Sequence, residues 1–147
     1  MKKLVLALTL VIAQQAAATT TIWKGEGNLF SLNGVEMGRY ELSVTNTKNA
    51  EVTESSIQIK TADGSVIELQ CTDTAGKDES WSSQCGQSKG GGRCFGEGLC
   101  ISYLEAENAK AFATTIIMDG PSDMRLLRTE LQSGKAVRFF REKLHKQ

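Results

Sequence analysis

The sequence predicts an all-β protein, an antiparallel up-and-down meander of eight or nine strands that closes into a small barrel. Apolar and polar residues alternate along most of the chain, turn signals separate the alternating runs, and no long helical pattern interrupts them. The 147 residues are enough for one domain. We expect a barrel because closure removes the two exposed edges that an open meander keeps.

The alternation is clearest between residues 39 and 71. Tyr40, Leu42 and Val44 alternate with polar residues, and the same period of two recurs over residues 56–60 and 66–71. Short Gly- or Asn-containing segments, which favour tight turns, separate these runs and the later ones. They are Asn33-Gly34, Ala62-Asp63-Gly64-Ser65, Glu107-Asn108, Asp119-Gly120-Pro121-Ser122 and Ser133-Gly134.

Two segments near the C-terminus also fit short helices. Residues 124–131 and 137–144 contain good helix formers with apolar residues near a spacing of three. We favour strands for both, because Ser133-Gly134 is a turn signal between them and the β-rich run Phe112–Met118 precedes them.

All four cysteines follow residue 70, and residues 72–98 break the alternation, so we interpret this segment as a long loop stapled by disulfides. Of the three connectivities we favour Cys71–Cys85 with Cys94–Cys100, because both close short local loops. A zinc site is the rival interpretation. It is disfavoured because the spacings are irregular and no C-x-x-C pair is present.

The N-terminus has the pattern of a bacterial secretory signal. Lys2 and Lys3 precede the ten-residue apolar run Leu4–Ala13, and small residues follow at 16–18. A ten-residue helix rises only ~15 Å, about half the hydrocarbon core of a bilayer, which disfavours a permanent membrane anchor. We therefore predict that residues 1–18 are cleaved, that residues 19–147 form one β-barrel domain, and that the protein is periplasmic or secreted.

The charges are balanced overall, with 17 basic and 17 acidic residues, but unevenly distributed. Residues 124–147 contain seven basic and two acidic residues. We interpret this mainly as complementary faces of one domain, and the alternative is an anionic partner near the C-terminus. The balance and the predicted compartment disfavour a nucleic-acid partner.

Trp23-Lys24-Gly25-Glu26-Gly27 opens the first predicted strand. A Trp followed by two alternate Gly at the start of a meander resembles the calycin superfamily, which includes lipocalins, fatty-acid-binding proteins and nitrobindin-like barrels. Thr21 stands where lipocalins have a Gly. The resemblance implies that Trp23 closes one barrel end, covered through a cation–π contact by a basic residue of the last strand, Arg138 or Arg141.

The same resemblance implies that the barrel binds a small, mostly apolar molecule without covalent attachment. We place the ligand contacts on aromatic residues at strand positions expected to face inward: Trp23, Tyr40, Tyr103 and Phe112. Nitrobindin-like barrels hold haem through a His. The only His here is His145, close to the C-terminus, so we expect no cofactor. We expect a monomer.

Two other functions remain open. An exported inhibitor of a hydrolase would present the stapled Cys85–Cys100 loop to an active site. A hydrolase that uses paired carboxylates would draw on Glu26, Glu97 or Glu105, although nothing in their spacing separates them from solvated charges, and we assign no catalytic residue. Lys89-Gly90-Gly91-Gly92-Arg93 fits a flexible loop better than an anion-binding loop, because it lacks the ending of a phosphate-binding motif.

Overall fold

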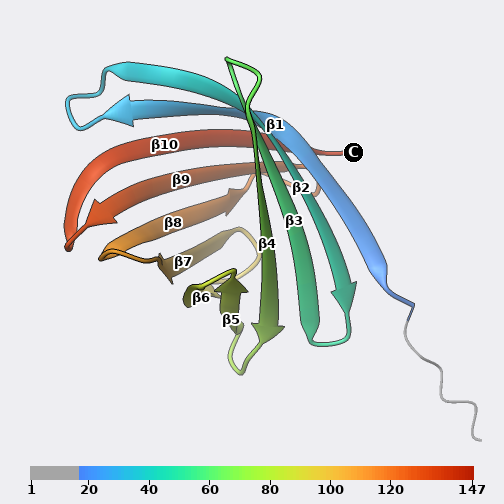
Figure 1. The fold of residues 1–147 in the computed structure, drawn as a ribbon. Coiled ribbons are helices and arrows are strands. Elements are labelled where there is room, and N and C mark those ends of the chain that lie inside the picture. The colour runs from blue at the N-terminus through green and yellow to red at the C-terminus, as the bar shows by residue number, and fades with distance from the viewer. Residues whose placement is uncertain (1–16) are drawn as a thin grey trace, which may run out of the picture.

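The structure is a computed structural model that describes residues 17–147. Residues 1–16 of the predicted signal peptide lie outside the described residues. Ten antiparallel strands form a closed barrel in which each strand pairs with its neighbours in sequence and β1 pairs with β10 (Figure 1). No helix among residues 17–147 has the length and apolarity needed to cross a membrane. The strands are β1 (Thr19–Ser31), β2 (Glu36–Asn49), β3 (Val52–Thr61), β4 (Val66–Ala75), β5 (Ser80–Cys85), β6 (Ser88–Cys94), β7 (Leu99–Glu105), β8 (Lys110–Met118), β9 (Asp123–Gln132) and β10 (Lys135–Lys146).

The predicted all-β meander and its closure are confirmed, and the predicted tight turns join consecutive strands. Gly34, Gly64 and Gly134 have φ angles of 78°, 85° and 77°, a region in which a Cβ is disfavoured. This is why glycine occupies these hairpin positions. The two segments that also fitted helices are strands β9 and β10.

The number of strands is ten, which corrects the predicted eight or nine. The missing strands are β5 and β6, within the segment that we expected to be a stapled loop. The glycines of residues 90–92 belong to β6 and are not a flexible loop. A Cβ on Gly90 would lie 1.9 Å from the carbonyl oxygen of Tyr103, and one on Gly92 would lie 2.2 Å from the Trp81 ring. Glycine is therefore required here because neighbouring strands approach closely.

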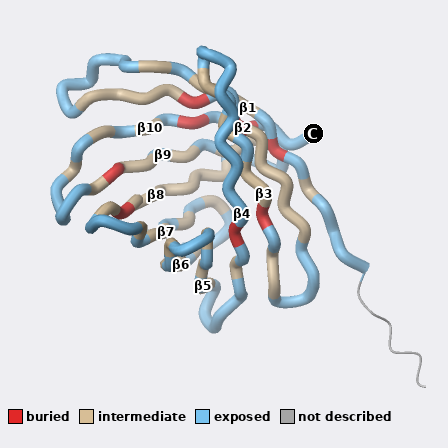
Figure 2. The backbone as a smooth tube through the Cα atoms, viewed as in Figure 1, coloured by how far each residue is buried: buried red, intermediate tan, exposed pale blue. Residues whose placement is uncertain are grey.

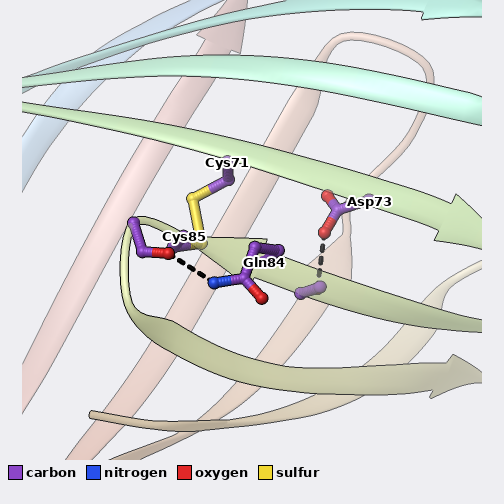
Figure 3. The surroundings of a disulfide bond; sticks show 6 residues. Cys71, Asp73, Gln84 and Cys85 are labelled. Carbon is purple, nitrogen blue, oxygen red and sulfur yellow. Dashed lines mark hydrogen bonds between the residues drawn. A yellow bond between two sulfur atoms is a disulfide. The ribbon is translucent and has the colours of Figure 1, made fainter. Parts of the chain in front are cut away.

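Both predicted disulfides are confirmed. Cys71–Cys85 joins β4 to β5, Cys94–Cys100 joins β6 to β7, and each links residues that lie directly opposite in the strand register. Figure 3 shows the first disulfide with Asp73, which accepts a hydrogen bond from Ser83 on the adjacent strand. The disulfides thus reinforce the part of the barrel with the shortest strands. Such bonds are typical of an oxidising compartment outside the cytoplasm.

Buried residues are few and scattered around the barrel wall (Figure 2). Trp23, Leu42 and Leu144 form the only cluster of buried apolar side chains in the described part of the chain. Most other apolar side chains that face inward remain partly exposed. An eight-stranded barrel is just wide enough for side chains to fill, and ten strands enclose a wider interior. Inward-facing apolar side chains therefore keep accessible surface, as Ile67 and Leu69 on β4 show with 50% and 42% exposure. The buried residues are Trp23, Gly27, Leu42, Ser55, Cys71, Ala111, Glu130, Glu142 and Leu144.

Candidate functional site in the barrel interior

The strand register determines which side chains point into the barrel. Trp23, Tyr40 and Phe112, three of the predicted ligand contacts, lie at inward-facing positions. Tyr103 does not: it lies on the outer face of β7 and is 45% exposed, which corrects its predicted place in the cavity. In β7 the outward set of Leu99, Ile101 and Tyr103 is more apolar than the inward set, so hydrophobic alternation alone gave the wrong face.

Trp23 fills one end of the barrel by packing against Leu42 and Leu144. The predicted covering arginine is wrong, because Trp23 is opposite Lys146, whereas Arg138 is opposite Ser31 and Arg141 is opposite Asn28. The guanidinium of Arg141 lies 5.5 Å from the centre of the Phe30 ring on the outer face. The apolar side chains of Leu42 on β2 and Leu144 on β10 thus pack against Trp23.

A polar group of half-buried Tyr40 and Arg128 with buried Glu142 lies next to this apolar end, and we name it the Glu142 cluster. Tyr40 on β2, Gly27 on β1 and Glu142 on β10 are aligned in register. The Tyr40 ring passes over Gly27, where a Cβ would lie 2.2 Å from a ring carbon, and its hydroxyl donates a 2.6 Å hydrogen bond to Glu142 Oε1. The second glycine of the Trp-Lys-Gly-Glu-Gly segment therefore provides space for this contact.

Arg128 completes the Glu142 cluster. Its Nη2 donates a 3.1 Å hydrogen bond to Glu142 Oε2, and its guanidinium lies 6.0 Å from the centre of the Phe140 ring. Both carboxylate oxygens of the 1% exposed Glu142 thus have a donor. Burial, followed by the negative charge of Glu142, raises the pKa of Tyr40, so the phenol stays neutral and acts as the donor.

A second charged group, which we name the Glu130 cluster, consists of Lys110, Glu130 and Arg138. Arg138 donates to both oxygens of Glu130, at 2.5 and 3.2 Å, and Lys110 Nζ lies 3.1 Å from Oε1. The hydrogen bond from Arg138 is the main reason that the pKa of Glu130 is lowered. Because Glu130 is only 3% exposed, its charge depends on these two cations.

From the sequence, Arg138 was one of the two arginines expected to cover Trp23, and no other charged residue of the two clusters was predicted to face the interior. The uneven charge distribution instead predicts that the basic residues of 124–147 lie on one face of the domain. A signal was nevertheless present in the sequence. Arg128 and Glu130 follow Leu126 at a spacing of two and therefore lie on the same side of β9. On β10, Arg138 and Glu142 lie on the same side as Leu144 for the same reason. Opposite charges at the apolar positions of two consecutive strands indicate ion pairs that face inward.

The other candidate groups are not brought together. Glu26 lies on the outer face of β1, Glu105 at the end of β7, and Glu97 in the turn between β6 and β7. His145 lies at the end of β10 and contacts Asp123. Among residues 17–147, no three His, Cys, Asp or Glu side chains are grouped so that they could hold a metal ion.

No protein-family model matches this chain, and a search of curated protein sequences finds no match.

Gly27→Ala tests the contact across Gly27. The added methyl group collides with the Tyr40 ring, so the ring moves and its hydrogen bond to buried Glu142 is lost. We expect the free energy of unfolding to fall by about 2–3 kcal/mol. Gly38→Ala is the matched control, because a Cβ there has no neighbour within 4 Å. Urea denaturation followed by circular dichroism measures both, and equal stabilities of the two variants would contradict the contact.

Glu130→Gln tests the Glu130 cluster. The pKa of Glu130 is lower in the folded state than in the unfolded state, where it is about 4.3. Ionised Glu130 therefore stabilises the fold at a pH above that value, and this stabilisation is lost as the pH falls through the pKa that Glu130 has in the folded state. We expect the variant to lose about 1–3 kcal/mol of stability at pH 7. The difference from the wild type should shrink between pH 7 and pH 3 in urea denaturation, and a difference independent of pH would contradict this role.

Proposed function

We propose that the barrel binds a small, mostly apolar molecule non-covalently in its interior. The observation that carries the proposal is the partial exposure of apolar side chains that face inward. Phe112, Ile116, Leu126 and Phe140 point inward from β8, β9 and β10 and yet remain partly exposed. Apolar surface left open inside a rigid wall favours an apolar ligand, because the ligand would remove that surface from water.

The order of residues along the barrel supports the same function. Apolar side chains pack at the Trp23 end of the barrel. Along β9 and β10, the Glu142 cluster comes next, and the Glu130 cluster lies farther from Trp23. An apolar wall with a few fixed polar groups is the usual composition of a small-molecule site. The resemblance to calycins, in which the barrel interior holds the ligand, is consistent with this proposal.

We further propose that the protein acts after export, as a periplasmic or secreted monomer. The predicted signal peptide of residues 1–18 and the two disulfides support this location.

Thr114→Trp and Thr115→Trp separate interior binding from binding to the outer surface. The two residues are adjacent on β8, and by strand register Thr114 faces inward and Thr115 outward. We expect the uncharged dye N-phenyl-1-naphthylamine to bind the wild-type protein with enhanced fluorescence. Thr114→Trp should weaken this binding by about tenfold or more, because an indole of that size occupies the volume of the ligand. Thr115→Trp should leave the affinity unchanged.

Absence of dye binding by the wild-type protein would contradict the proposal. So would a loss that is larger in Thr115→Trp than in Thr114→Trp, because that result would place the dye on the outer face.

Inhibition of a hydrolase is the second candidate function. The observation that favours it is the hairpin between β6 and β7, where Phe95 is 54% exposed and the Cys94–Cys100 disulfide ties the two strands beside it. A rigid hairpin with an exposed aromatic residue suits insertion into an active site, because little conformational entropy is lost on binding.

Phe95→Ala tests this candidate against a panel of lysozymes and serine proteases. If the hairpin inhibits one of them, Phe95→Ala should raise the inhibition constant by about tenfold or more. Leu32→Ala is the control, because Leu32 is equally exposed in the hairpin between β1 and β2. Absence of inhibition across the panel, or equal losses in both variants, would reject this candidate.

A further inference from the structure

The outer face of the barrel has an apolar region on β7, β9 and β10 that the interior site does not use. Ile101, Tyr103, Leu127 and Phe139 are exposed there, between 38% and 47% each. On β3 the outward positions are instead polar, as in Glu54, Ser56, Gln58 and Lys60. Exposed apolar residues gathered on one face of a barrel indicate an interaction surface.

Two rows of residues cross the strands in this region, and together we name them the outer groove. On the middle strand, β8, Ala113 and Thr115 are small, whereas β7 and β10 present the larger Tyr103 and Phe139, so the surface is hollowed between them. A hollow of about 590 Å³ extends across β6–β9, and a second of about 500 Å³ shares Leu127 and Thr129 with it and continues to β10. The first row is Gly91, Tyr103, Ala113, Thr129 and Phe139, and the second is Arg93, Ile101, Thr115, Leu127 and Arg141.

The second row begins and ends with an arginine. Arg93 Nε donates a 3.1 Å hydrogen bond to the backbone oxygen of Asp78, and Arg141 lies over the Phe30 ring. Neither forms an ion pair with a carboxylate of residues 17–147, and no described Asp or Glu lines either hollow. Four strand spacings separate the two arginines, a path of about 19 Å along the sheet.

We propose that the outer groove docks an apolar segment of a partner protein that carries a carboxylate near each end. The apolar floor would bury the middle of the segment, and Arg93 and Arg141 would each receive one carboxylate. In an extended chain a separation of 19 Å corresponds to about six residues. A bilayer is the weaker alternative, because a flat surface cannot fill a hollow, whereas side chains of a partner can.

The proposal concerns the outer wall and is independent of the interior site. The probe is a fluorescein-labelled peptide, Glu-Thr-Val-Leu-Tyr-Thr-Glu, capped at its C-terminus, and its control has Gln in place of both Glu. Fluorescence anisotropy with the purified, disulfide-bonded protein should show binding of the Glu peptide that weakens as NaCl is raised from 50 to 300 mM. The Gln peptide should bind more weakly.

Charge-reversal variants locate the contact. Arg93→Glu and Arg141→Glu should each weaken binding of the Glu peptide by about threefold to tenfold, because each replaces an attraction by a repulsion. Lys60→Glu, on the outer face of β3, changes the net charge equally and should leave the affinity within about twofold. The three variants change exposed side chains, and circular dichroism verifies that each is folded.

Several results would overturn the proposal. One is no binding of the Glu peptide, or equal binding of both peptides, and another is the same effect of Lys60→Glu as of the two arginine variants. Binding to phosphatidylglycerol vesicles that requires Arg93 and Arg141, without peptide binding, would assign the groove to a membrane. A dimer in sedimentation equilibrium that Leu127→Asp dissociates would assign it to a second copy of this chain.

Discussion

The pairing of β1 with β10 is the constraint on which the rest of the structure depends. It closes the barrel and aligns Gly27 between Tyr40 and Glu142, so one hydrogen bond reaches across three strands. Without this closure the chain would be a curled sheet with two open edges, and no interior would exist. A buried carboxylate at the closure also makes the register specific, because a shift by one residue would move Glu142 to the outer face.

The width of the barrel determines how it can be stabilised. Ten strands enclose a wide interior, and buried apolar packing in the described chain is confined to the Trp23 end. Farther along, ion pairs and hydrogen bonds of the Glu142 and Glu130 clusters link neighbouring strands. Disulfides do the same for the short strands β5 and β6. The fold therefore relies on links between strands within the wall.

Local patterns were sufficient for the turns, the disulfides and the strand identity of the last two segments. They did not predict β5 and β6, which consist mainly of Ser, Gly and Cys and therefore lack an alternation of apolar and polar side chains. Pairing with closely approaching neighbouring strands keeps these two segments extended. Local patterns were also insufficient for Tyr103 and for the arginine over Trp23. Which face of β7 points inward, and which residue of β10 lies opposite Trp23, depend on the register around the whole barrel, which no single segment contains.

Nuclear Overhauser effects between protons of β1 and β10 test the central claim, the closure of the barrel, most directly. The register predicts backbone contacts between Gly25 and Leu144 and between Gly27 and Glu142, together with slow exchange of the amide protons of both strands. Absence of these contacts, with fast exchange along β1 and β10, would show that the sheet is open. Both the interior site and the order of residues along it would then be wrong.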